Sequence, residues 1–269
     1  MEGQDLLAGA MQYDLTATLD GRALRICGIG SLVAPPGLSG PDHARTLLEK
    51  SLDEAARRGV DMALLFAPAD LTGAVLRGFT RIAGSDVTLH VAESPRHGAP
   101  MTMVRGGEER DFPAVAAMGR VRAEAFRFHL DRDVDFIQHV ITRKRLRAGL
   151  GSPGLRQLQF FIAEEGITAA AYVVVSVEGT TWTLEECGDR DASGARVGAL
   201  LQALIAREPA ERRPTIRGWL PSGFLPPQLT VVSTTPSPDI LMVRMLGSTS
   251  AASSPLGAAD VLYWRNDVF

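Results

Sequence analysis

Several features are scarce in this 269-residue sequence, and their scarcity excludes whole classes of protein. Aromatic residues make up 6%, and the only cysteines are Cys27 and Cys187, so a disulfide-stabilised secreted domain is excluded. The N-terminal residues lack the apolar segment of a secretory signal. No apolar run approaches the roughly 18 residues of a membrane span. We therefore expect a protein of the reducing cytoplasm with no membrane partner.

An excess of charge of either sign is also missing. Lys and Arg number 28 against 31 Asp and Glu, which gives a net charge of -3. This balance provides no general attraction to nucleic acid, so no nucleic-acid partner is expected. The 45% of hydrophobic and 22% of charged residues are typical of a globular protein. At about 150 residues per domain, the length fits two domains or one large one.

The first 66 residues show an alternation of strand and helix patterns. Residues 13–19 and 23–33 read as two strands joined by Asp20-Gly21, the dipeptide that a tight hairpin turn prefers. A helix is predicted from about Pro41 to Arg58, with Gly59 as its C-terminal stop, and a buried strand follows at residues 60–66. The predicted order is strand, strand, helix, strand.

The rest of the chain repeats and extends this order, which indicates a diverged internal duplication. We predict an α/β (α+β) fold with mixed sheets and two domains of one type, the first lacking its opening elements. The predicted boundaries are 1–92 for the first domain, 93–100 for a linker, 101–246 for the second domain and 247–269 for a second linker with a docking strand. Helices are expected at about 112–128, 133–146 and 194–205, and the strands at 229–232 and 240–245 are expected to form a hairpin.

The stretch from Gly28 to Glu49 combines a strand end, a glycine-containing loop and a helix start with paired leucines. A helix N-terminus with exposed N–H groups attracts a pyrophosphate, and glycine lets the backbone approach it closely. This stretch resembles the cofactor motif of the GNAT superfamily of acyl-CoA-dependent N-acetyltransferases. The residues that carry the resemblance are Gly30, Ser31, Val33, Pro36, Gly40, Ala44, Leu47 and Leu48, followed by the run Gly59–Phe66.

The resemblance implies acetyl-CoA as co-substrate and a small-molecule or peptide amine as acceptor. The residues it assigns to acetyl-CoA are Leu32, Val33, Ser39, Gly40, Asp42, His43, Ala44 and Arg45. The tandem layout with a C-terminal tail is similar to the enhanced-intracellular-survival type, in which the terminal carboxylate is a catalytic base. That similarity assigns this role to the carboxylate of Phe269. Formation of a homo-oligomer stays open.

The sequence also departs from the GNAT pattern in ways that affect chemistry. Ser39 stands in place of the loop arginine, and Asp42 puts a carboxylate where phosphate should bind. Ala74 stands at the position of the tyrosine that protonates the departing thiolate, and alanine has no proton to donate. The alternative function is therefore a catalytically silent GNAT-derived module that binds a ligand or a partner.

The remaining polar clusters have structural interpretations. The carboxylates from Asp131 to Asp135 fit a helix cap better than a metal site, so no metal is expected. The cations from Arg143 to Arg147 fit a solvated helix end. In the second copy Asp189 and Asp191 occupy the place of the cofactor motif and disfavour phosphate, which indicates a structural pseudo-domain. Glu185, Glu186 and Cys187 are further candidates for the lining of an acceptor pocket.

Overall fold

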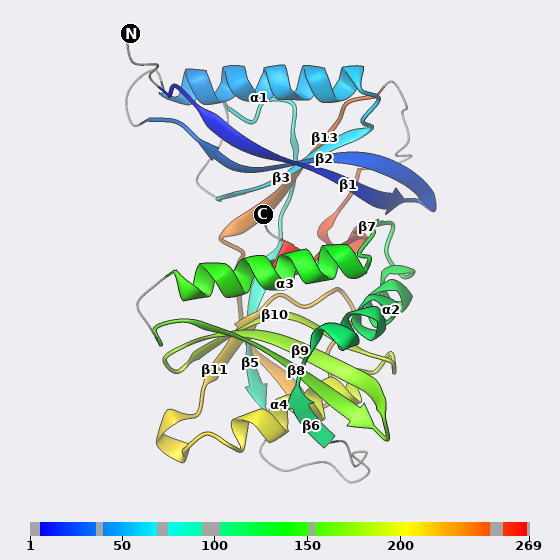
Figure 1. The fold of residues 1–269 in the computed structure, drawn as a ribbon, viewed down its shortest axis with the longest axis vertical. Coiled ribbons are helices and arrows are strands. Elements are labelled where there is room, and N and C mark those ends of the chain that lie inside the picture. Colours follow the sequence, from blue (N-terminus) through cyan, green and yellow to red (C-terminus); the bar gives the residue numbers. More distant parts are fainter. Residues whose placement is uncertain are drawn as a thin grey trace.

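The computed structural model of the protein describes residues 6–35, 40–68, 75–92, 103–150, 154–247 and 255–267. Within these ranges the chain forms two mixed sheets of seven strands and four α-helices, with one sheet above the other (Figure 1). The strand order is β14-β7-β1-β2-β3-β13-β4 in the first sheet and β12-β5-β11-β10-β9-β8-β6 in the second. The predicted α/β class with mixed sheets is confirmed.

The N-terminal hairpin forms as its turn predicts. Strand β1 (Gly9–Leu19) pairs in antiparallel register with β2 (Arg22–Val33). Asp20 and Gly21 have φ angles of 48° and 77°, the positive values that a tight primed turn requires at both central positions. This hairpin supplies the centre of the first sheet.

Helix α1 (Gly40–Arg57) follows the hairpin and covers one face of the first sheet. Gly59 ends it with a φ of 74°, and β3 (Met62–Pro68) then runs parallel to β2. Leu48 and Leu52 of α1 are buried against Ile29 and other apolar side chains of β2 and β3. The crossover from β2 through α1 to β3 therefore buries a core of its own.

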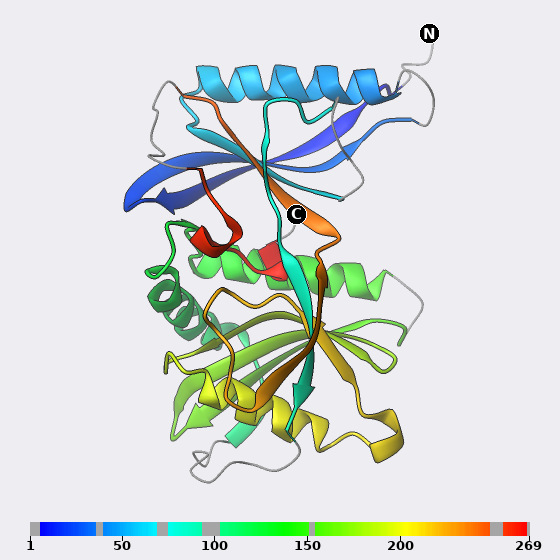
Figure 2. The ribbon, with the colours of Figure 1, turned by 180° about the vertical axis from the view of Figure 1, so that it is seen from behind.

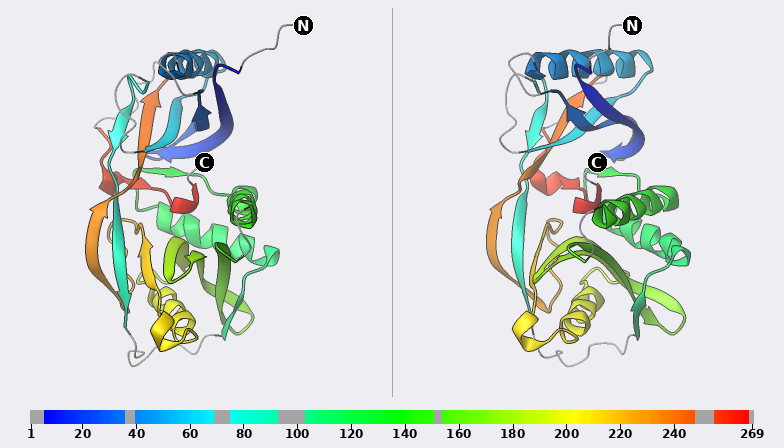
Figure 3. Two further views of the ribbon diagram at one scale, coloured as in Figure 1. Left: turned by 90° about the vertical axis from the view of Figure 1, so that its left-hand side faces the viewer. Right: turned by 60° about the vertical axis from the view of Figure 1, so that its left-hand side comes forward.

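The second sheet carries helices on both faces (Figure 3). Helices α2 and α3 bury apolar side chains against β8 and β9 on one face, and α4 packs on the other. The bounds are β6 (Met103–Gly106), α2 (Phe112–Ala123), α3 (Val134–Gly149), β8 (Gln157–Glu165), β9 (Thr168–Glu178), β10 (Thr181–Asp189), α4 (Ala195–Ile205) and β11 (Thr215–Gly218).

The two sheets exchange strands. Residues 80–91 form β4 (Thr80–Ile82) in the first sheet and then β5 (Ser85–Val91) between β11 and β12 of the second. In return, β12 (Leu229–Pro236) lies in the second sheet and β13 (Asp239–Met245) lies between β3 and β4 of the first. The two segments lie side by side where they cross from one sheet to the other (Figures 2 and 3). Neither sheet is therefore complete without residues from the other half.

This exchange corrects the prediction of a hairpin from residues 229–232 and 240–245. The two segments do form strands, but β12 pairs with β5 and β13 pairs with β3 and β4, in different sheets. The predicted domain boundaries stay a prediction, and sheet membership crosses them at β5 and β13. Two consecutive strands pair with each other only when the chain turns back between them. Here the chain continues from the second sheet into the first without turning back.

The second half contributes two more short strands to the first sheet. The helix predicted to reach residue 128 ends at Ala123, and Phe128–Leu130 form β7, which pairs with β1. Arg127 accounts for this change, because its carbonyl accepts the N–H of Asp20 at 2.8 Å and its guanidinium pairs with the Asp20 carboxylate at 2.7 Å. The apolar C-terminal tail forms β14 (Val261–Leu262) next to β7.

The described helices include none that is both long and apolar enough to cross a membrane. A continuous apolar core joins the facing sides of the two sheets, with Leu19, Met62 and Leu241 from the first and Leu184 and Trp182 from the second. Because the sheets share strands and this core, the two halves should unfold as one cooperative unit.

Leu52→Ala should reveal this coupling. Leu52 is 1% exposed beneath α1, and its truncation should lower the free energy of unfolding by ~2–5 kcal/mol. All three tryptophans lie at positions 182, 219 and 264, in the second half and the tail. We expect the urea midpoint seen by tryptophan fluorescence to fall together with the midpoint seen by far-UV circular dichroism. The exposed Leu146→Ala is the control; separate transitions would contradict a single unit.

Candidate functional site

An opening between two parallel strands marks the candidate site in the first half. The pairing of β2 with β3 begins at Ile26 and Met62 and ends at Ile29 and Leu65, although β2 continues to Val33. Ser31 has a φ of 51°, and the register with β1 shifts by a bulge near it. Within the described residues, the backbone at Leu32 and Val33 therefore has no pairing with β3, although Val33 still pairs with Gly9 of β1.

The N-terminus of α1 lies next to the end of β2. A Cβ on Gly40, the first residue of α1, would lie 2.5 Å from the carbonyl oxygen of Pro35, so only glycine allows this tight approach of helix and strand end. Gly40 and Ala44 are buried, whereas Asp42 is exposed and His43 and Arg45 are partly exposed. The structure thus gathers the predicted residues Leu32, Val33, Gly40, Asp42, His43, Ala44 and Arg45 around one opening; Ser39 lies outside the described residues.

The Asp42 carboxylate is partly neutralised in this position. An Arg45 guanidinium nitrogen lies 3.2 Å from a carboxylate oxygen of Asp42, one helical turn away, and both side chains contact solvent. An exposed pair of this kind is weak, so Arg45 can exchange its partner for a phosphate. The helix N-terminus thus presents its N–H groups together with a mobile cation, as an anion site requires.

The second half contains an equivalent opening. The parallel pairing of β10 with β11 ends at Leu184 and Gly218, while β10 continues through a bulge to Asp189. Helix α4 begins just after this strand, as α1 begins after β2. The two halves therefore share the arrangement of splayed parallel strands followed by a helix N-terminus.

The chain's own side chains fill the second opening, beginning with the helix N-terminus. The buried carboxylate of Asp189 accepts hydrogen bonds from the backbone N–H groups of Arg196 at 2.8 Å and Val197 at 3.4 Å. The same carboxylate pairs with the Arg196 guanidinium at 3.2 Å. An internal anion thus takes the place that a pyrophosphate would need. This supports the interpretation of the second copy as a pseudo-domain.

The C-terminal tail fills the rest of the second opening. The Tyr263 ring stacks on Trp219, the residue directly after β11, with 4.6 Å between ring centroids. The indole of Trp264 meets Trp219 edge-on at 6.0 Å and is 2% exposed. Figure 2 shows this tail between the two halves.

Buried ion pairs hold the tail in place. Arg132 donates two hydrogen bonds to Glu186 of β10, at 2.8 and 2.6 Å, and its Nε lies 3.0 Å from the carboxylate of Asp267. Tyr172 donates to the same Glu186 at 2.5 Å. Burial raises the pKa of Asp267 although the adjacent Arg132 opposes this. Two carboxylates and one guanidinium are thus buried together.

A second buried pair lies beside the first. Lys144 of α3 donates to the Glu185 carboxylate and, at 2.9 Å, to the backbone carbonyl of Arg265. Ser176 donates to the other oxygen of Glu185 at 2.6 Å. Burial lowers the pKa of Lys144, although Glu185 opposes this. Glu185 and Glu186 therefore anchor the tail, and neither faces an open acceptor pocket.

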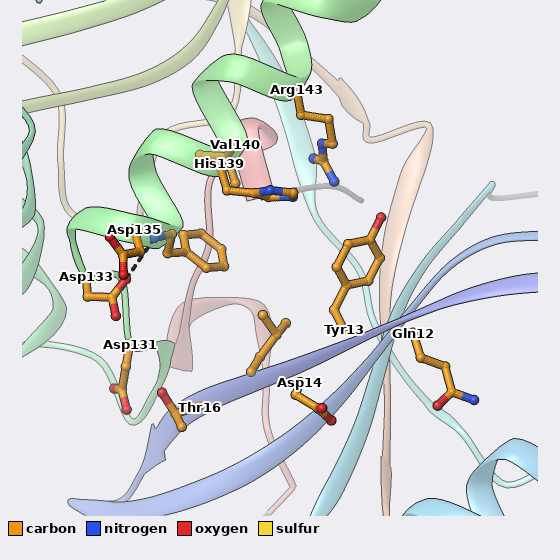
Figure 4. A pocket seen from close by; sticks show the side chains of 12 residues that line it. Gln12, Tyr13, Asp14, Thr16, Asp131, Asp133, Asp135, His139, Val140 and Arg143 are labelled. Atoms are coloured by element: carbon orange, nitrogen blue, oxygen red, sulfur yellow. Dashed lines mark hydrogen bonds between the residues drawn. The ribbon is translucent and has the colours of Figure 1, made fainter. Parts of the chain in front are cut away.

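A pocket of about 570 Å³ lies between β1 of the first sheet and α3 of the second half. Its polar side chains come from both elements and from the loop before α3 (Figure 4). It lies one strand from the first opening, because Tyr13 pairs with Gly28 and Gln12 with Ile29, where the pairing of β2 with β3 ends. The polar side chains that face it most directly are Tyr13, Asp131, Asp133, Asp135, His139 and Arg143.

Three comparisons relate this geometry to known proteins. No protein-family model matches the sequence, and no curated protein matches it either. Solved structures do match: a GCN5-related N-acetyltransferase from Kribbella flavida at 17% identity and one from Anabaena variabilis at 14%, each with a TM-score of 0.63. The alignments cover 91% and 89% of this chain but only 59% and 60% of those proteins.

The chain has the GCN5-related N-acetyltransferase fold. Eis1 from Mycobacterium abscessus shares it at 14% identity and a TM-score of 0.57, with 90% of this chain and 62% of Eis1 covered. The chain spans about three fifths of the length of these proteins. The resemblance inferred from residues 28–66 is therefore confirmed at the level of fold.

Some predicted residues of the GNAT-like site find no support here. Phe269, the predicted source of a catalytic carboxylate, lies outside the described residues, as does Ala74. Cys187, a candidate for the lining of an acceptor pocket, is 1% exposed and, within the described residues, faces no open pocket, and burial raises the pKa of its thiol. Sequence reasoning missed Tyr13 and His139 as pocket residues, because nothing local indicates that β1 and α3 face each other.

Arg132→Met should release the tail. It leaves Glu186 and Asp267 buried without their cation, which should lower the free energy of unfolding by ~3–5 kcal/mol. A buried carboxylate with a raised pKa binds more protons in the folded state than in the unfolded state, so its contribution to stability falls as pH rises. In urea titrations, the free energy of unfolding that Arg132→Met loses relative to the wild type should therefore be larger at about pH 8 than at about pH 5.

Arg156→Met is the matched control for this experiment. Arg156 forms an exposed pair with Glu178 at 3.0 Å, and its loss should change stability by less than ~1 kcal/mol at either pH. Equal deficits for the two variants would contradict the role of the buried pair.

Proposed function

We propose that the chain is an acyl-CoA-dependent N-acetyltransferase that transfers acetyl from acetyl-CoA to an amine. The observation that carries this proposal is the contrast between the two openings. Asp189 accepts N–H groups of α4 and the tail packs on Trp219 at the second, whereas the described residues show no hydrogen bond from a first-turn N–H group of α1 to a carboxylate. The first half thus retains the features of an acyl-CoA site, whereas the second half has a structural role.

Acetyl-CoA would bind with its pyrophosphate at the N-terminus of α1. The helix N–H groups of the first turn and the Arg45 guanidinium would contact the phosphates. The backbone of Leu32 and Val33, which does not pair with β3, would hold the pantetheine arm and polarise the thioester carbonyl with an N–H donor. Leu32, Val33 and Arg45 thereby receive roles that their positions permit.

The chemistry requires one bond to form and one to break. The amine nitrogen attacks the thioester carbonyl carbon, a C–N bond forms, and the C–S bond breaks with release of CoA. An amine that enters as an ammonium ion must first lose one proton, and the nitrogen's second proton leaves as CoA departs as its thiol. The chain's tasks are to position the two reactants and to accept the first proton.

The pocket between β1 and α3 is the proposed binding site of the acceptor. Its lining includes four carboxylates and one guanidinium, which supports a cationic acceptor over an anionic one. Its 570 Å³ lie in the range of small-molecule sites, so a small-molecule amine is favoured over a protein side chain. The two buried free thiols are consistent with a cytoplasmic location.

Titration calorimetry tests the proposal directly. We expect about one acetyl-CoA per chain, because the second opening is filled internally. Two equivalent binding events would contradict the pseudo-domain, and absence of heat from a folded sample would contradict the acyl-CoA site. Binding without acetylation of any amine in a panel would support the catalytically silent module instead.

Asp42→Asn should increase the affinity for CoA about threefold to tenfold at low salt. The change removes a negative charge near the proposed phosphates and frees Arg45 from its pair. The gain should shrink at about 0.5 M salt because the charges are exposed and screened. Asp53→Asn, an exposed position of the same helix, changes the net charge equally and should leave the affinity unchanged. Equal gains in the two variants would show a general charge effect.

A further inference from the structure

One ladder of polar side chains on α3 faces the pocket between β1 and α3. Asp135, His139 and Arg143 are spaced four residues apart, so they lie one above another on a single face of the helix. Figure 4 shows all three on the side of α3 that faces the pocket. His139 is exposed and stands in the middle of this ladder.

His139 also lies beside the strand that adjoins the first opening. Its ring meets the Tyr13 ring at 64° with 6.3 Å between centroids. Tyr13 pairs with Gly28, one residue before the last pair of β2 with β3. Neighbouring strands lie ~4.8 Å apart, so Tyr13, with the imidazole beside it, lies within about two strand spacings of the point after Ile29 where β2 and β3 separate.

The other charged groups of the pocket either have hydrogen-bond or ion-pair partners or are less suited to accept a proton from an amine. Asp133 caps α3 by accepting the N–H of Phe136 at 2.8 Å, and Asp131 accepts the hydroxyl of Thr18 at 3.1 Å. Asp14 lies 3.8 Å from the guanidinium of Arg58. A carboxylate is in general a weaker base than an imidazole, and a guanidinium cannot accept a proton at all.

We propose that His139 is the catalytic base of the transfer, and that the acceptor is a small-molecule primary alkyl amine that enters as its ammonium ion. This assignment rests on the proposed function. The imidazole takes one proton from the ammonium nitrogen and passes it to solvent, and the neutral amine then attacks the thioester carbon. Asp135 and Arg143, one turn to either side, and Tyr13 across the pocket are the charged and titratable neighbours that orient the ring.

The test compares two amines of similar size that differ in charge. 2-Phenylethylamine is an ammonium ion at neutral pH and needs a base, whereas phenylhydrazine is already neutral and does not. His139→Gln should lower kcat for 2-phenylethylamine by about 10²- to 10⁴-fold and leave kcat for phenylhydrazine within about threefold. The KM for acetyl-CoA should stay within about twofold, because His139 does not contact the cofactor opening.

His90→Gln is the matched control. His90 is an exposed histidine on β5 of the second sheet, outside the pocket, and its replacement should change neither rate. Circular dichroism checks that both variants fold. Since glutamine is a good helix former and position 139 is exposed, α3 should tolerate the change.

Three results would overturn the assignment, and they differ from one another. Equal losses with both amines would show that His139 has a structural role. An unchanged rate in His139→Gln, together with loss of activity on deletion of Val268 and Phe269, would identify the terminal carboxylate as the base. Failure of the wild-type protein to bind acetyl-CoA in calorimetry would remove the proposed function itself, and the assignment with it.

Discussion

The exchange of strands between the two sheets is the constraint on which the rest of the structure depends. Strand β13 fills the gap between β3 and β4, and β5 fills the gap between β11 and β12, so each half completes the other. Separation of the halves would leave N–H and C=O groups unpaired on every strand that pairs across them, which is costly without new partners. The relative position of the halves is therefore fixed by backbone pairing and by the apolar core between the sheets.

The second opening is occupied by groups of the chain itself. Asp189 satisfies the N-terminus of α4, and the rings of Tyr263 and Trp264 cover Trp219. Arg132 then compensates the carboxylates of Glu186 and Asp267 at the centre of the molecule.

Local signals in the sequence predicted the local structure well. Asp20-Gly21 predicted the hairpin and Gly59 predicted the end of α1, since both depend on backbone conformations that few residues adopt. Strand exchange could not be predicted, because the pattern of residues 80–91 or 229–245 does not encode the partner of a strand. The short strand β7 was missed because Arg127 is held by Asp20, more than a hundred residues away.

The residues of the candidate acceptor pocket could not be predicted from the sequence. One wall is β1 of the first half and the other is α3 of the second, so no single segment contains it. The sequence predicts Tyr13 on a strand and His139 on an exposed helix face, but it does not indicate that the two residues are neighbours. Their 6.3 Å separation depends on the exchanged strands and on the buried pairs that tie α3 to the tail through Lys144. The geometry of this pocket therefore depends on contacts made by both halves of the chain.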